Sequence, residues 1–229
     1  MNTQKWLKVE FHCHTHASRD SINDLPDLLK TAHLSGIDRL AITDHNTIRG
    51  ALKAKELDPE LVIVGEEILT RQGELIAYFL EREVPSGLDA MLAIKKLKNQ
   101  GAFISIPHPM DRHRHGWEIT ELQKIVPHID AIEVFNARCF STKANDLAFQ
   151  FARCHHLPML AGSDAHTKLE LGYGITKLPY FENAHHLRQV VHQGILETRL
   201  FPPWKHALAN GILFLNYFLF WKWTARELI

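Results

Sequence analysis

The chain has 229 residues, of which 45% are hydrophobic, so it is long enough for one large domain with a sizeable core. Its 26 basic residues balance 26 acidic residues, which excludes a strong overall attraction to nucleic acid or to an anionic membrane. Cys13, Cys139 and Cys154 are too few and too far apart for a disulfide framework, and the first five residues are too polar for a signal peptide. We therefore expect a cytoplasmic protein.

Short apolar runs alternate with longer amphipathic segments along most of the chain. In chain order, the pattern predicts a strand over residues 6–11, a helix over 25–35, a strand over 37–43, a helix over 48–57, strands over 61–64 and 74–80, a helix over 87–100, a strand over 102–106, a helix over 119–126, a strand over 131–135, a helix over 144–155, a strand over 159–162 and a helix over 187–193. This alternation indicates a parallel α/β sheet or barrel.

A histidine-rich stretch follows the first predicted strand. His12 and His14 point the same way if the strand continues through them, whereas Cys13 between them faces away. Two imidazoles with the carboxylate of Asp20 nearby form part of a site for a divalent cation. Chance clustering is the alternative, because the chain has 16 histidines.

Polar residues also occur at or just after the ends of other predicted strands. In α/β folds the ligand site lies beyond the carboxyl ends of the strands, so a barrel would gather these residues at one rim. The candidates for metal ligands are His12, His14, Asp20, His45, Glu67, His108, Asp164 and His166. Mixed imidazole and carboxylate ligands suit zinc, manganese or iron(II). This set is too large for one ion, and several close cations favour phosphate ester hydrolysis, with amide or amidine hydrolysis as the competing chemistry.

Six motifs resemble, in order, those of the PHP (polymerase and histidinol phosphatase) superfamily. They are His12-Cys13-His14 with Ser18 and Asp20, Thr43-Asp44-His45-Asn46-Thr47, Gly65-Glu66-Glu67-Ile68, Pro107-His108-Pro109, Glu133-Val134-Phe135-Asn136 and Gly162-Ser163-Asp164-Ala165-His166. The resemblance covers roughly residues 6–200. It implies a distorted (β/α)7 barrel with two or three metals at the C-terminal rim and metal-dependent phosphoesterase activity.

The resemblance also implies which residues hold each metal. His12, His14, Glu67 and Asp164 would bind the first, Asp20, His45 and His166 the second, and Glu67 and His108 the third. These residues are also the expected catalytic residues, acting through a hydroxide that bridges two metals and attacks phosphorus. Glu74 stands where many relatives have a further histidine. It would ligate the third metal as a carboxylate, or the site is binuclear or weakly loaded.

Substrate binding is expected from a loop rich in basic residues after Pro107-His108-Pro109. Arg112 or Arg114 would bind phosphate through the guanidinium fork, and a solvated charged loop is the alternative. The further candidates for substrate contact are Arg19, Asn136 and Arg138.

The expected organisation is a phosphoesterase domain over residues 1–200 and an apolar helical extension over 201–229. The extension would pack against the barrel, form a contact between two copies in a homo-oligomer, or lie on a membrane surface. The expected substrate is a small phosphorylated metabolite or nucleotide. The alternatives are exonuclease or phosphodiesterase action on nucleic-acid ends, which the lack of a strongly basic stretch disfavours, and a metal-binding regulatory domain with little catalysis.

Overall fold

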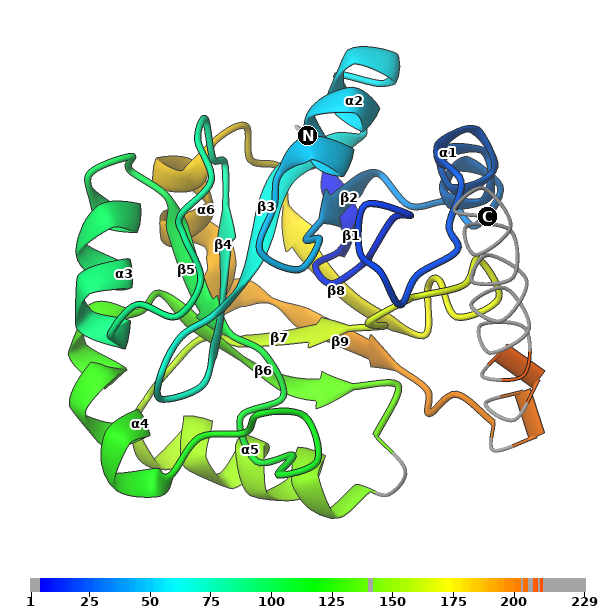
Figure 1. Cartoon of the computed structure of the whole chain (residues 1–229). Helices are drawn as coiled ribbons and strands as arrows, with labels where there is room; N and C mark the ends of the chain where they lie inside the picture. The colour runs from blue at the N-terminus through cyan, green and yellow to red at the C-terminus, as the bar shows by residue number, and fades with distance from the viewer. Residues whose placement is uncertain (1–4, 140–141, 203, 206–207, 210, 212–229) are drawn as a thin grey trace, which may run out of the picture.

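The computed structural model of the chain describes residues 5–139, 142–202, 204–205, 208–209 and 211, which contain nine strands and six α-helices (Figure 1). The strands are β1 (Trp6–Glu10), β2 (Arg39–Ile42), β3 (Val62–Leu69), β4 (Glu74–Tyr78), β5 (Phe103–Ile106), β6 (Ala131–Asn136), β7 (Met159–Gly162), β8 (Gly174–Pro179) and β9 (Ile195–Thr198). The helices are α1 (Leu25–Leu34), α2 (Arg49–Leu57), α3 (Ala90–Lys98), α4 (Ile119–Ile125), α5 (Thr142–Cys154) and α6 (Ala184–Val190).

All nine strands belong to one sheet, in the order β7-β6-β5-β4-β3-β2-β1-β8-β9. The sheet curves into a nearly closed barrel with the helices around its outside (Figure 1). Closure brings β7 against β8, where the main-chain N–H of Ala161 donates to Thr176 Oγ1 at 2.9 Å. Gly174 is required at this contact, because a Cβ there would lie 2.3 Å from the main-chain oxygen of Gly162.

The direction of the strands decides where the functional residues meet. Strands β1, β2 and β3 are parallel, as are β5, β6 and β7, while β4 runs antiparallel to both β3 and β5. Six strands therefore end at the same rim of the barrel. Strand β8 is antiparallel to both of its neighbours in the sheet.

Apolar residues at helical spacing fix the helices against the sheet. In α1 the buried residues are Leu25, Leu28, Leu29 and Ala32, one stripe of an amphipathic helix. Helix α3 begins at a side-chain cap, since Asp89 accepts a hydrogen bond from the N–H of Met91 at 3.0 Å. These faces share one core cluster with the outward-facing residues of the strands, and a second cluster joins β1, β5 and α6.

The predicted barrel architecture is confirmed. Its sheet has nine strands where seven were expected, because the sequence pattern predicts no strand where β8 and β9 lie. Strands β4 and β8 also break the parallel pattern. The alternating pattern is weak in β9, whose residues are exposed or half-buried. The predicted helix over 187–193 begins earlier, at Ala184, and ends in a 3-10 turn, η2 (Val191–Gln193).

The apolar C-terminal helix expected from the sequence lies, apart from a few residues at its start, outside the described residues. Its role and the division of the chain at residue 200 remain predictions. Among the helices that the structure describes, none has the length and apolar character needed to cross a bilayer.

Candidate metal centre

The predicted ligands come together at the rim where the six strands end. His12 and His14 follow β1, His45 follows β2, and His108 follows β5. Glu67 lies within β3, while Asp164 and His166 follow β7. Main-chain hydrogen bonds join these segments, since the N–H of Asp164 donates to the oxygen of His12 at 2.8 Å and that of His14 donates to Ala165 at 3.0 Å.

Glu67 occupies the centre of the cluster. Its Oε2 lies 3.0 Å from His45 Nδ1, 3.3 Å from His12 Nε2 and 3.4 Å from His14 Nε2. Its Oε1 lies 3.1 Å from His108 Nε2. One buried carboxylate thus faces the imidazoles of four histidines from three different segments, those that follow β1, β2 and β5.

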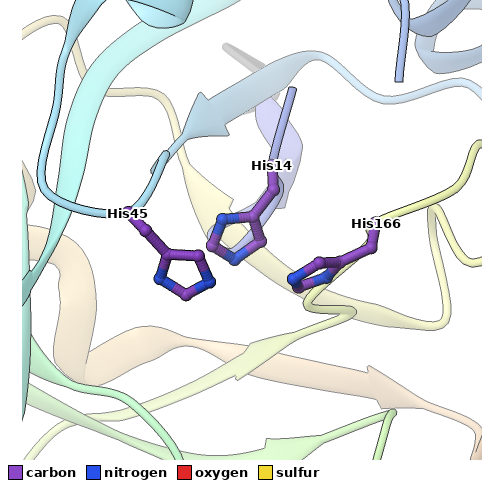
Figure 2. A group of neighbouring side chains, drawn as sticks. All are labelled: His14, His45 and His166. Atoms are coloured by element: carbon purple, nitrogen blue, oxygen red, sulfur yellow. The ribbon is translucent and has the colours of Figure 1, made fainter. Parts of the chain in front are cut away.

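A second group of imidazoles consists of His14, His45 and His166 (Figure 2). The ring of His14 is 4.4 Å from that of His45 and 4.3 Å from that of His166, between centroids. Asp20 closes this group, with Oδ2 at 3.2 Å from His166 Nε2 and 3.4 Å from His45 Nε2. Asp20 is the most exposed of the predicted ligands, with 58% of its side chain accessible.

The backbone is held in unusual conformations at two of the ligands. His108 and Asp164 have φ angles of 24° and 53°, in a region that residues other than glycine rarely adopt. Such strain persists only where the surroundings enforce it, and it concentrates at functional sites. Gly162 is needed nearby, because a Cβ there would lie 2.2 Å from Glu133 Oε1.

Two further carboxylates orient the histidines. Glu133 Oε1 lies 3.0 Å from His12 Nδ1, which directs His12 Nε2 toward Glu67. Asp44 accepts hydrogen bonds from Ser18 Oγ and from the N–H of Thr15, each at 2.7 Å. Both residues belong to motifs named in the sequence analysis, and their positions in those motifs were the available signal for these roles.

The arginines expected to bind substrate lie in different environments. Arg114 and Arg138 line a cavity of about 460 Å³ that opens over the cluster. Arg114 contacts Asp164, while Arg112 and Arg19 are exposed. Asn136 donates to Glu133 Oε2 at 3.0 Å and to Asp164 Oδ2 at 3.2 Å, so its amide is part of the network around the ligands.

Comparisons with known proteins identify the family. Residues 10–107 match the model of the PHP domain, and residues 142–194 match that of the PHP-associated region. A protein of Methanocaldococcus jannaschii of uncharacterised function is 35% identical over 175 residues, which cover 75% of this chain and 70% of that protein. The chain belongs to the PHP family. A second uncharacterised protein of the same organism is 38% identical over 146 residues, covering 57% of this chain and 82% of that protein.

Solved structures share the PHP fold at low sequence identity. PsfC from Pseudomonas syringae superposes with a TM-score of 0.69 at 17% identity, covering 91% of this chain and 98% of that chain. A Bifidobacterium adolescentis protein assigned as a metal-dependent phosphoesterase gives 0.57 at 17% identity, covering 70% and 88%. The lesion-specific endonuclease of Pyrococcus furiosus gives 0.60 at 17% identity, covering 84% of this chain and 58% of that chain.

Membership of the PHP family makes this chain a hydrolase of the metal-dependent phosphoesterase type. The residues at the rim fit divalent cations. Within the described part of the chain, Glu67 Oε2 and His108 Nδ1 are buried without a hydrogen-bond partner. Buried polar atoms are normally satisfied, so these two indicate groups arranged for a ligand. Four overlapping sets of His, Asp and Glu have ligand atoms within 4.8 Å of one another, including His12, His14 and Glu67.

The charges at this PHP site are strongly coupled. Burial, together with the neighbouring His166 and His45, lowers the pKa of His14 to about 3, so this imidazole stays neutral as a metal ligand must. Burial opposes ionisation of Glu67, but His12 and His45 outweigh it and hold the pKa of Glu67 well below its ordinary value. Burial likewise opposes protonation of His12, and Asp164, Glu67 and Glu133 reverse the effect and raise its pKa well above the usual range.

Glu74, where this chain departs from the PHP pattern, lies within the site. Its Oε2 is 3.8 Å from His108 Nε2, and its main-chain oxygen accepts a hydrogen bond from Trp117 Nε1 at 2.9 Å. Burial and the nearby charge of Glu67 raise the pKa of Glu74 to about 9. A bound cation would reverse this effect by favouring the carboxylate, so the position suits a metal ligand.

Proposed function

We propose that this chain hydrolyses phosphate monoesters of a small metabolite or nucleotide, using two or three divalent cations. The position of Glu67 carries the proposal, because both of its oxygens face imidazoles and one carboxylate can serve adjacent cations. His12, His14, Glu67 and Asp164 would hold the first, Asp20, His45 and His166 the second, and Glu67, Glu74 and His108 the third. When bound, such cations lower the pKa of water to near neutrality and neutralise the charge of the phosphoryl group.

The protein's own contribution is orientation. Glu133 fixes the ring of His12, and Ser18 Oγ lies 3.3 Å from His14 Nδ1, which leaves Nε2 of both rings facing Glu67. Arg114 and Asn136 both contact Asp164 Oδ2, and Asp164 Oδ1 is the oxygen that faces His14, at 3.3 Å. Ligands held from behind in this way bind metal with less loss of conformational freedom.

Arg138 is the arginine that we assign to the phosphate group of the substrate. It lines the cavity beside His166 and is half-buried, which strengthens an ion pair with an anion relative to one in open water. A guanidinium presents two parallel N–H groups to two phosphate oxygens. Arg112 and Arg19, exposed near the rim, would contribute by their charge as a substrate approaches.

Two observations favour a small monoester over nucleic acid. The cavity of about 460 Å³ is of the size that holds a small ligand, and the net charge of the chain is zero. Nucleic-acid partners are usually met by a basic surface. A diester substrate is the second candidate, since the endonuclease of Pyrococcus furiosus shares the fold.

Hydrolysis of p-nitrophenyl phosphate and of bis(p-nitrophenyl) phosphate tests the proposal. The full chain is loaded with Mn²⁺, and each rate is measured with and without a chelator, together with nucleotides as substrates. We expect metal-dependent release of p-nitrophenol from the monoester, with slower turnover of the diester. Faster turnover of the diester than of the monoester would favour phosphodiesterase activity. No turnover of any of these substrates would favour the alternative of a metal-binding regulatory domain with little catalysis.

A further inference from the structure

Glu170 is a buried carboxylate beside the site that the roles assigned so far do not use. It lies in the segment between β7 and β8 and is fully buried. Its Oε2 accepts hydrogen bonds from the N–H groups of His166 and Thr167, at 2.9 Å and 2.7 Å, and from Thr167 Oγ1 at 3.1 Å. Its Oε1 accepts no hydrogen bond from the described residues and forms an ion pair with Arg138, whose Nε lies 3.3 Å away. One carboxylate therefore connects the loop that carries His166 to an arginine of the cavity.

The outer nitrogens of Arg138 lack a settled acceptor. Nη1 lies 2.5 Å from His166 Nδ1, and the same ring nitrogen lies 2.9 Å from the main-chain oxygen of Asp164. A carbonyl oxygen only accepts and a guanidinium only donates, so Nδ1 cannot satisfy both contacts in one tautomer. None of the contacts among the described residues uses Nη2 of Arg138. The guanidinium is thus fixed at one end and open to an anion at the other.

Arg114, the other arginine of the cavity, is bound internally. Its Nε donates to Asp111 at 2.9 Å, Nη1 contacts Asp164, and Nη2 lies 3.2 Å from Asn136 Oδ1 and 3.3 Å from Cys139 Sγ. These four contacts leave one of the five N–H groups of a guanidinium. Arg114 therefore has no free pair of N–H groups for a phosphate, whereas Arg138 has.

We propose that Glu170 is a positioning residue that acts through Arg138. By pairing with Nε, Glu170 keeps the two terminal nitrogens of Arg138 available to the cavity, where they would bind two oxygens of a phosphate dianion. The same carboxylate holds the N–H groups of the His166 loop, so the anion-binding arginine and a metal ligand keep a fixed separation. This inference rests on the proposed phosphatase function and assigns the residue that sets the affinity for the phosphate group.

Steady-state kinetics with a double-mutant cycle test the proposal. The wild type, Glu170→Gln, Arg138→Ala and the double variant are compared with Mn²⁺ and p-nitrophenyl phosphate. Glutamine keeps an oxygen for the loop but turns an amide N–H toward Arg138. We expect KM to rise about tenfold or more in each single variant, as for loss of a charge-assisted contact, with kcat changed much less. The double variant should match Arg138→Ala within about twofold, because both changes remove one interaction.

A matched control separates positioning from general support of the loop. Glu10, the last residue of β1, is another fully buried carboxylate that binds this segment. It accepts from the N–H of Ser163 at 2.9 Å and of Gly172 at 3.2 Å, and no arginine pairs with it among the described residues. Glu10→Gln should leave KM within about twofold of the wild type. Arg138→Lys keeps the charge but has no Nε–H group and no guanidinium fork, so it should raise KM as Arg138→Ala does. In the Arg138→Lys background, Glu170→Gln should cause no further change in KM. If Glu170→Gln does not fold, the KM of Arg138→Lys still tests whether the guanidinium fork binds the phosphate group.

The affinity of the Mn²⁺-loaded protein for inorganic phosphate, measured by calorimetry, tests the role of Glu170 separately from the proposed phosphatase function. If the wild type hydrolyses none of the phosphate esters, the proposed function fails, yet Glu170→Gln should still weaken phosphate binding about tenfold. Additive effects in the cycle would overturn the role of Glu170. So would a variant with unchanged KM and phosphate affinity but lower kcat and weaker Mn²⁺ binding, because Glu170 would then only support the metal ligands.

Discussion

The barrel has a cavity of similar size at each end, and the two differ in how their polar groups are satisfied. The cavity at the carboxyl ends of the parallel strands, about 460 Å³, contains the carboxylates and imidazoles described above. The cavity at the opposite end, about 510 Å³, is lined by the starts of β2 and β3, and its charged residues are Arg39, Lys55, Glu60 and Glu182. Volume alone does not distinguish them.

The two cavities differ in whether buried polar atoms nearby have hydrogen-bond partners. Among the described residues, the buried side-chain atoms without a hydrogen-bond partner belong to Glu66, Glu67, His108 and Glu170, and none of these lines the opposite cavity. There, Lys55 Nζ already donates to the main-chain oxygens of Pro59 and Val62. Glu67 and His108 line the cavity at the carboxyl ends of the parallel strands, whereas Glu66 and Glu170 line neither cavity. Unsatisfied groups on a cavity wall thus occur at one end, which identifies it as the end arranged for a ligand.

The largest effect is expected at Glu67. Glu67→Gln keeps the shape of the side chain but removes the negative charge shared by the cations. We expect kcat for p-nitrophenyl phosphate to fall about 1,000-fold, since metal stabilisation of the transition state contributes several kcal/mol. Glu60→Gln, at the opposite cavity, is the matched control and should retain wild-type kcat. Equal loss in both variants would contradict the contrast between the two ends.

The pH dependence of stability tests the effect of burial on Glu10 in the absence of bound cations. Burial raises the pKa of Glu10 to about 7, although hydrogen bonds from Ser163, His12 and Gly172 oppose the shift. A raised pKa means that the folded state binds this proton more tightly than the unfolded state. Its stabilising contribution is therefore complete below the ordinary value of 4.5 and is lost as pH rises through 7.

The size of this effect is about 3 kcal/mol, because folding raises the pKa of Glu10 from 4.5 to about 7. Denaturant unfolding of the wild type and of Glu10→Gln is measured between pH 5 and 8, in chelator so that no cation contributes. The free energy of unfolding of the wild type should fall relative to the variant as pH rises. Parallel curves for the two proteins would show that Glu10 is ionised at all these pH values.

Glu74 tests how far the cation cluster extends. Glu74→Gln should lose about one bound Mn²⁺ per chain and about tenfold in turnover, as for removal of a ligand at the edge of a metal site. Glu74→His, which places there the histidine that the family resemblance implies, should keep both. Elemental analysis after gel filtration gives the metal content. An unchanged content in Glu74→Gln would place this carboxylate outside the ligand set.

Sequence could predict the residues at the rim because each follows its own strand, so local pattern and strand direction suffice to place them together. His12, His45 and Asp164 show this. The strands β8 and β9 could not be found, because antiparallel pairing at the seam of the barrel compensates for weak local alternation. The different roles of Arg114 and Arg138 also depend on contacts with Asp164 and Glu170, which lie 50 and 32 residues further along the chain.

The smallest effect is expected at Lys55, which lines the cavity at the opposite end of the barrel. Its Nζ lies 2.7 Å from the main-chain oxygen of Val62, and burial, followed by the charge of Arg39, lowers the pKa of Lys55. Lys55→Met removes a half-buried donor to two main-chain oxygens, so the free energy of unfolding should fall by about 1 kcal/mol. Phosphatase kinetics and Mn²⁺ content should both remain within about twofold of the wild type. A larger loss of activity without unfolding would mean that the two ends of the barrel are coupled, and the opposite cavity would then have to be treated as part of the functional machinery.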